Sequence, residues 1–360
     1  MKAEYDDSTK EPAYIRLYRS IVNDITTGIY AYGSKLPSKR SIAEKTGVSV
    51  ITVEHAITLL SEEGYVQSRE RSGVFVIYRG EDFLGEAVEP QIIVHEKEKV
   101  QHDTGEFPFS VLSRTMRRVL LDYGEEILIK SPNHGCWVLR EEICRYLARS
   151  RGIYVRPSQV IIGSGAEYLY GLIAQLIGAD NIIAIEKPSY KKIRDVYEAM
   201  GMTCDELSMN PDGIVKEELE RTKAKVLHVT PFNSFPSGVT AGISKRLEYL
   251  RWAKTRGGII VEDNYDSELT VSRKIEEPLF SMDKEVRVIY LNTFSRTIAP
   301  SMRLGYMILP KDLEEVFNSK LGFYSCTVPV YDQYVLAELL KNGDFERHLN
   351  RVRRKRRMNY

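Results

Sequence analysis

The segment at residues 292–306, NTFSRTIAPSMRLGY, holds side chains that are suited to chemistry. It follows the apolar stretch RVIYL at 287–291 and leads into a second apolar stretch. A polar turn between two apolar strands, with a basic residue in it, is typical of a site for a phosphate and a reactive amine. An amine that condenses with a carbonyl must be a neutral primary amine, which lysine provides. Position 296 holds arginine, which stays protonated and only donates hydrogen bonds, so no Schiff base can form there.

Polar segments also follow other apolar stretches from about residue 102 onward. The apolar stretches lie at 159–164, 181–186, 225–231, 258–263, 287–292 and 303–310. Helical patterns, among them those at 167–178 and 244–257, separate these stretches. Such alternation predicts an α/β fold with a mostly parallel sheet, in which ligands bind at the carboxyl ends of the strands. The polar segments at those ends read GSGAEY, EKPSY, TPFNSFPSG, EDNYDSE and TFSR.

The first part of the chain has a different pattern, which predicts three helices. An amphipathic segment at 14–28 ends at Gly28, a residue that favours a helix stop. Ser38 is suited to cap a short helix and Ser49 to cap another. The residues expected to face inward from these two helices are Ile42, Ala43, Val53, Ala56, Ile57 and Leu60.

Residues 65–78 read as two short strands around a polar turn. Together with the helices they predict a winged helix-turn-helix, whose second helix would enter a DNA major groove. Residues 1–76 hold as many Lys and Arg (2, 10, 16, 19, 35, 39, 40, 45, 69, 71) as Asp and Glu (4, 6, 7, 11, 24, 44, 54, 62, 63, 70). Because phosphate neutralisation supplies much of the affinity for DNA, one such domain should bind weakly and a dimer is expected.

The stretches LPSKR, GVSVITVEHA, EEGYV and SGVFV resemble the DNA-binding domain of the GntR family of bacterial regulators. The resemblance implies that double-stranded DNA is contacted by Ser38, Arg40, Ser49, Thr52 and Gly73, the last at the tip of the wing. Val50 stands where the family usually has arginine, and Glu54 where some relatives carry arginine. A winged helix that is used only for protein contacts is the alternative.

Residues from about 100 to 360 resemble the fold-type-I aminotransferase domain that MocR-type regulators carry behind a GntR-type domain. The five polar segments at the strand ends match in sequence order. The resemblance implies a site for pyridoxal 5′-phosphate formed by Gly165, Ala166, Tyr190, Asn233, Asp263, Tyr265, Thr293, Ser295, Arg296 and Arg303.

The resemblance also implies a role for each of these residues. Tyr190 would stack on the pyridine ring, Asp263 would pair with the ring nitrogen, and Tyr265 would contact the phenolic oxygen. The phosphate would be held by Gly165, Ala166, Thr293, Ser295 and Arg303, the last of which suits bidentate recognition. The alternatives are a plain tight turn at 163–166, an ordinary core or surface tyrosine at 190, and acidic turn caps at 262–268.

Two positions depart from the family pattern. Asn233 stands where the regulators usually have histidine, but its amide can still bond the phenolic oxygen. Arg296 stands where family members hold the cofactor through lysine, so any cofactor would be bound non-covalently. Arg296 could donate to that cofactor, bind a different anion, or form a salt bridge with Asp263.

The C-terminus differs from the family as well. The chain ends at RHLNRVRRKRRMNY, in a helical pattern, where the family continues into a small subdomain. The basic run at 347–357 could touch the DNA backbone, but a solvated helix face is the expected reading.

Length and composition agree with this organisation. The chain has 360 residues, 43% apolar and 28% charged, with a net charge of +1. No apolar run reaches the roughly 18 residues of a membrane span, and the N-terminus is too polar for a signal peptide. The four cysteines show no metal-ligand spacing, so a cytoplasmic protein with reduced thiols and no metal is expected. The expected parts are a DNA-binding domain at 1–78, a linker at 79–101 with at most a short strand at 91–94, and an aminotransferase-like domain at 102–360.

These observations predict a transcriptional regulator. Its winged helix would read an operator, and its larger domain would dimerise and sense a small anionic effector. Transaminase activity is not expected, because Arg296 replaces the lysine. A pyridoxal-phosphate enzyme with a DNA-binding appendage, and a degenerate domain that serves only as a dimerisation scaffold, remain the alternatives.

Overall fold

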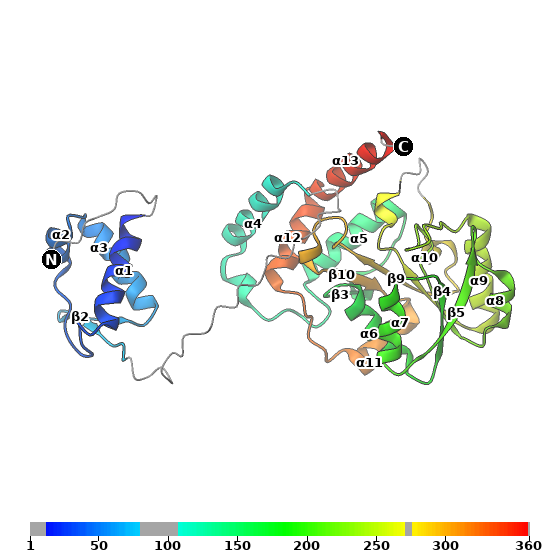
Figure 1. Cartoon of the computed structure of the whole chain (residues 1–360), viewed down its shortest axis with the longest axis horizontal. Coiled ribbons are helices and arrows are strands. Elements are labelled where there is room, and N and C mark those ends of the chain that lie inside the picture. Colours follow the sequence, from blue (N-terminus) through cyan, green and yellow to red (C-terminus); the bar gives the residue numbers. More distant parts are fainter. Residues whose placement is uncertain (1–11, 80–106, 271–275, 359–360) are drawn as a thin grey trace. The chain divides into compact units, whose positions relative to one another are not determined.

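The computed structural model describes residues 12–79, 107–270 and 276–358 (Figure 1). The chain divides into two units, Met1–Glu98 and Lys99–Tyr360, and each is described by itself. All of the expected linker except Arg79, with its short strand at 91–94, lies outside the described residues. No helix in the described ranges is both long enough and apolar enough to cross a membrane.

The N-terminal unit contains three helices and a β-hairpin. Their bounds are α1 Ala13–Thr26, α2 Lys39–Thr46, α3 Val50–Glu62, β1 Val66–Arg69 and β2 Gly73–Val76. The side chains of Ser38 and Ser49 cap α2 and α3, each by accepting a hydrogen bond from a first-turn N–H. The residues predicted to face inward from α2 and α3 are buried, as periodicity indicated. The winged helix-turn-helix fold is therefore confirmed.

The tip of the wing is formed by the turn at 70–72, in which Arg71 has a φ of 58°. The sequence suggested that Gly73 lies at the tip of the wing. This is wrong, because Gly73 is the first residue of β2 and pairs with Arg69. Its φ of 114° lies in a region that favours glycine over residues with a Cβ.

The C-terminal unit is built on an eight-stranded sheet with the order β3-β10-β9-β8-β7-β4-β5-β6. The central strands β9, β8, β7, β4 and β5 are parallel, whereas β10 runs antiparallel to both β3 and β9. The bounds are β3 Val160–Gly163, β4 Ile182–Lys187, β5 Thr203–Asn210, β6 Gly213–Ile214, β7 Val226–Val229, β8 Ile259–Asp263, β9 Arg287–Thr293 and β10 Gly305–Ile308. The predicted α/β class with a mostly parallel sheet is confirmed.

Helices cover both faces of this sheet, because successive residues of each strand point to opposite faces. Val288 and Tyr290 of β9 face one layer, and Ile289 and Leu291 face the other. The first layer comprises α4 Phe109–Tyr123, α5 Trp137–Arg151, α8 Lys216–Arg221, α9 Ile243–Arg256, α10 Leu279–Met282, α12 Val330–Lys341 and α13 Asp344–Met358. The second comprises α6 Ala166–Ile177, α7 Lys191–Ala199 and α11 Lys311–Leu321.

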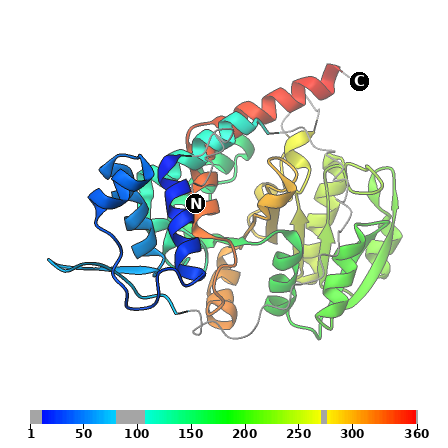
Figure 2. The same cartoon turned by 60° about the vertical axis from the view of Figure 1, so that its left-hand side comes forward.

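Helix α13 lies beside α4 and α5 in both views (Figure 1 and Figure 2), and Glu346 pairs with Arg149 of α5 at 2.7 Å. Two members of its basic run are not merely solvated. Arg353 Nε donates to the Glu268 carbonyl at 2.6 Å, and Arg356 Nη1 donates to the Leu269 carbonyl at 3.2 Å. The expectation of a solvated helix face is therefore wrong for these two residues.

Candidate functional site

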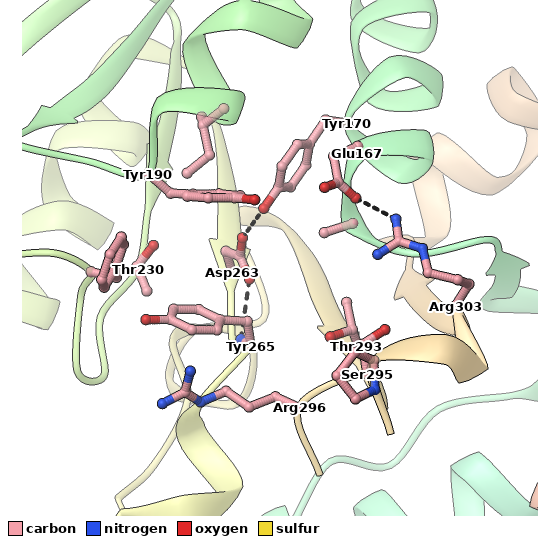
Figure 3. Close-up of a pocket in the computed structure, with 14 residues that line it drawn as sticks. Glu167, Tyr170, Tyr190, Thr230, Asp263, Tyr265, Thr293, Ser295, Arg296 and Arg303 are labelled. Atoms are coloured by element: carbon pink, nitrogen blue, oxygen red, sulfur yellow. Dashed lines mark hydrogen bonds and ion pairs between the residues drawn. The ribbon is translucent and has the colours of Figure 1, made fainter. Parts of the chain in front are cut away.

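A pocket of about 350 Å³ opens at the carboxyl ends of β8 and β9 and at the start of α6 (Figure 3). This is where a parallel sheet of the predicted kind places its ligands. Most of the residues expected there line it: Ala166, Tyr190, Asp263, Tyr265, Thr293, Ser295, Arg296 and Arg303. Gly165 and Asn233 are adjacent to the pocket but do not line it.

Gly165 has a structural task at the pocket. It lies between β3 and α6 with a φ of 98°, and an added Cβ would come within 2.9 Å of Arg303 Nη2. Its own N–H already donates to the Gly163 carbonyl at 2.9 Å. The donors that remain for an anion are therefore the first-turn N–H groups of α6, beginning at Ala166.

Asp263 is the last residue of β8, and its carboxylate is 2% exposed. The Tyr170 hydroxyl donates to Oδ2, and the Tyr265 N–H donates to Oδ1 at 3.1 Å (Figure 3). His228 Nε2 lies 3.7 Å from Oδ2, and the other ring nitrogen is 2.9 Å from the Tyr197 hydroxyl. The carboxylate thus accepts hydrogen bonds from Tyr170 and Tyr265, and the buried His228 ring lies beside it, with Nε2 making no hydrogen bond in the described structure.

Sequence reasoning missed Tyr170 and His228. Burial, and then the charge of Asp263, raise the pKa of Tyr170 well above its ordinary value, so this phenol remains a donor. Tyr170 gave little signal, since it lies among apolar residues in a helical pattern. His228 gave a usable one, because it is a polar residue inside the apolar strand KVLHVTP.

Arg296 follows β9 and pairs with Asp266, with Nε 2.5 Å from Oδ1. Asp266 is 1% exposed and also accepts a hydrogen bond from Asn233 Nδ2. The salt bridge to Asp263 that the sequence offered as one alternative is therefore not the one formed. In Figure 3 the Tyr265 side chain lies between Asp263 and the Arg296 guanidinium, whose central carbon is 5.7 Å from that ring's centroid.

The other end of the pocket is also basic. Arg303 Nη2 lies 2.7 Å from Glu167 Oε2, and Lys192 Nζ lies 2.8 Å from Glu167 Oε1. Desolvation alone would raise the pKa of Glu167, but hydrogen bonds from Lys192 and Arg303 lower it to about 2. The Ser295 hydroxyl is buried without a hydrogen-bond partner in the described structure. Arg303 and Ser295 both line the pocket, so an anion bound there would have a guanidinium and an unpartnered hydroxyl available to it.

The loop after β7 supplies Phe235 to the pocket and is anchored on Glu186 of β4. Ser234 Oγ donates to Glu186 Oε2 at 2.6 Å, and the Thr230 N–H donates to Oε1 at 3.2 Å. The carboxyl group is fully buried, and burial raises the pKa of Glu186 to about 8, although both hydrogen bonds act in the opposite direction. At neutral pH this anchor is therefore mostly protonated.

Glu186→Gln should raise the free energy of unfolding at pH 9 by on the order of 4 kcal/mol and change it little at pH 4, where this carboxyl is mostly protonated in both the folded and the unfolded protein. A carboxyl whose pKa is raised on folding stabilises the fold fully only below its ordinary pKa of 4.5, and this contribution is lost as the pH rises from there through about 8. Glutamine resembles the protonated acid but does not ionise, so its contribution to stability does not change with pH. Denaturant unfolding at both pH values measures the difference, with exposed Glu220→Gln as the control. An equal loss of stability at both pH values would contradict the assignment.

On the N-terminal unit, the residues expected to touch DNA are gathered around α2 and α3, except Gly73, which lies in β2. Arg40 is exposed at the start of α2. The Ser38 hydroxyl accepts from the Ser41 N–H at 3.2 Å, and the Ser49 hydroxyl accepts from the Thr52 N–H at 3.1 Å. The Ser49 and Thr52 hydroxyls also lie 2.8 Å apart. The Ser38 and Ser49 hydroxyls therefore cap α2 and α3 in this structure. No cluster of His, Cys, Asp or Glu suited to a metal occurs within the described ranges.

Comparisons with known proteins agree with this arrangement. Residues 13–76 match the model of the bacterial regulatory proteins of the gntR family. The chain is 34% identical over 355 residues to the HTH-type transcriptional regulator YdeL of Bacillus subtilis (strain 168), covering 95% of this chain and 76% of that protein. It is 28% identical to the probable rhizopine catabolism regulatory protein MocR of Rhizobium meliloti, covering 97% of this chain and 76% of that protein.

Solved structures with a similar fold are aminotransferases. An archaeal alanine:glyoxylate aminotransferase matches 67% of this chain with a TM-score of 0.62 and 25% identity, and a kynurenine aminotransferase of Pyrococcus horikoshii matches 69% with a TM-score of 0.63 and 26% identity. The chain spans 62% and 64% of those two enzymes, less than two thirds of their length. With a gntR-type winged helix in front of an aminotransferase-like domain, the chain belongs to the GntR family of helix-turn-helix transcriptional regulators, in the MocR-type architecture.

Proposed function

We propose that this transcriptional regulator binds pyridoxal 5′-phosphate, or a closely related anion, reversibly in the pocket between β8, β9 and α6. The bound anion then acts as an effector, not as a catalytic group. The observation that carries the proposal is the Arg296–Asp266 pair at 2.5 Å, in a pocket that keeps Asp263 and its donors. The pocket has the polar groups of a cofactor site without an amine at position 296.

The residues present fit this ligand. Arg303, the unpartnered Ser295 hydroxyl and the first-turn N–H groups of α6 suit the phosphate. Asp263 suits a protonated ring nitrogen, and Tyr190 and Tyr265 supply aromatic and hydroxyl contacts. Pyridoxal phosphate, when bound, supplies an aldehyde and an electron-accepting ring.

Arg296 gives the pocket a different task from that of an enzyme. Its guanidinium stays charged, and it can only donate hydrogen bonds to a ligand oxygen. Asp266, which also accepts a hydrogen bond from Asn233, holds the guanidinium in place on the far side of Tyr265. We therefore expect binding without a covalent bond and no transaminase activity. A pocket that serves only as part of a dimerisation scaffold is the alternative.

The DNA-binding part of the proposal rests on the winged helix. We propose that the protein functions in the cytoplasm as a homodimer, because two copies would place two winged helices on the two halves of a symmetric operator. Pairing also compensates for a domain in which acidic and basic residues balance. The proposed parts are residues 1–78 for DNA, 79–101 as linker and 102–360 for dimerisation and ligand binding. Because the two copies of a symmetric dimer contact equivalent half-sites, we expect a palindromic footprint.

Titration of the purified protein with pyridoxal 5′-phosphate tests the ligand. We expect a saturable absorbance change that dialysis reverses, and no covalent adduct by mass analysis after borohydride reduction. Asp263→Asn should weaken the affinity by about tenfold or more, because it removes the charge that faces the ring nitrogen. Absence of saturable binding would leave the scaffold alternative, and a trapped adduct would show that another lysine forms the bond.

A further inference from the structure

The outward face of α3 has a chemistry that is unusual for a helix meant to read DNA. Its inward residues, Val53, Ala56, Ile57 and Leu60, fill the core of the N-terminal unit. The side opposite them presents Ile51, which is 67% exposed, together with Val50, Glu54, His55 and Thr58. The helix sequence, VITVEHAITLLSE, contains neither lysine nor arginine. Its exposed face therefore offers methyl groups, hydroxyls, the His55 imidazole and a carboxylate, with no guanidinium or ammonium group.

Glu54 is held in a defined position on this face. Lys39, from the first turn of α2, forms an ion pair with Glu54 Oε1. That hydrogen bond lowers the pKa of Glu54, so the carboxylate remains charged at neutral pH. Oε2 has no partner among the residues that the structure describes. One end of the carboxylate is thus anchored between the two helices, and the other remains available as an acceptor.

The four bases present different groups in the major groove, and only some of these groups match the exposed face of α3. Guanine presents two acceptors, O6 and N7, which are most often read by the guanidinium or ammonium donors that α3 lacks. Cytosine presents the N4 amino group, a donor that a carboxylate can accept from, and thymine presents a methyl group that suits aliphatic side chains. We propose that Glu54 selects cytosine and that Val50 and Ile51 select neighbouring thymine in each operator half-site. This inference rests on the proposed role of α3 as the helix that reads DNA.

Phosphate contacts would come from residues outside this face. Arg40 is exposed at the start of α2, and Lys39 keeps part of its surface open at 40% exposure. These groups position the helix but carry no sequence information. The competing interpretation is that the Lys39–Glu54 pair is an ordinary surface ion pair, which contributes little to any property of the protein. The two interpretations differ in what replacing Glu54 does to the preferred sequence.

Selection from a pool of randomised duplexes, with the full chain as the protein, distinguishes them. The unaltered protein should enrich half-sites with cytosine next to thymine. Glu54→Gln should replace that cytosine with adenine, because the glutamine amide pairs with adenine N6 and N7, and should leave the other positions unchanged. Ile51→Ala should relax the thymine preference only. The discrimination at the Glu54 position should be about tenfold.

Glu62→Gln is the matched control, since Glu62 is exposed at the far end of the same helix, and it should select the original sequence. Selection of the same sequence by Glu54→Gln, or of an A·T pair at that position by the unaltered protein, would overturn the inference. Failure of the unaltered protein to enrich any duplex would overturn the proposed DNA-reading role of α3, and the inference with it. This outcome can be told apart from a changed or unchanged base preference.

Discussion

An Arg296→Lys variant that is incubated with pyridoxal 5′-phosphate and reduced with borohydride should carry a stoichiometric covalent adduct, whereas the unaltered protein should carry none. The substitution places a primary amine in a pocket that already holds Asp263, Tyr265 and Arg303. Lysine can lose its proton and attack an aldehyde, and a guanidinium cannot. The adduct is detected by mass analysis of the intact protein and located by peptide mapping.

Asp266 decides how readily that amine reacts. Its buried carboxylate now lies 2.5 Å from Arg296 Nε, and beside lysine it would favour the protonated, unreactive form. The double substitution Arg296→Lys with Asp266→Asn removes that charge and should form the adduct faster at neutral pH than the single variant. At higher pH the lysine is deprotonated in both variants, so their rates of adduct formation should become more similar.

Arg303→Lys is the matched control for this experiment. It introduces the same amine at the other end of the same pocket, next to Glu167, where a phosphate rather than an aldehyde is expected. This variant should show weaker reversible binding and no adduct. An adduct at position 303 with none at 296 would mean that the ligand lies in the opposite orientation, and the assigned roles of the two arginines would be wrong.

Leu60→Ala should abolish specific DNA binding and leave the binding of pyridoxal phosphate unchanged. Leu60 is fully buried in the small apolar core of the N-terminal unit. Truncation of a buried leucine costs about 2–5 kcal/mol, which is a large share of the stability of a unit of this size. All residues that line the pocket belong to the other unit, so the ligand titration should not change.

The measurements are an electrophoretic mobility shift and the absorbance titration on the same preparation. Glu62→Ala serves as the control, since it removes an exposed side chain from the same helix and should retain DNA binding. Loss of both activities in Leu60→Ala would show that the winged helix and the pocket unit fold as one cooperative body. Retention of DNA binding would show that α3 is held in place by contacts other than this core.

Much of the fold was predictable because the relevant forces act over short distances along the chain. The serines at 38 and 49 cap their helices, and the apolar residues of α3 recur at helical spacing. The strand ends were recognisable because apolar runs stop at polar segments. By contrast, β5 was missed, since Thr203–Asn210 is a mostly polar strand near the edge of the sheet, where a continuous apolar run is not required.

The sequence by itself determined the class of both units, the family, and the absence of an amine at position 296. These follow from residue identity and from periods of two and 3.6, which are local properties. The tertiary structure alone decided that Arg296 pairs with Asp266 instead of Asp263, that Tyr170 donates to Asp263 with His228 lying beside it, and that Arg353 and Arg356 donate to the carbonyls of residues 268 and 269. Each of these contacts joins segments that are far apart along the chain, so each depends on how the loops place the side chains in space.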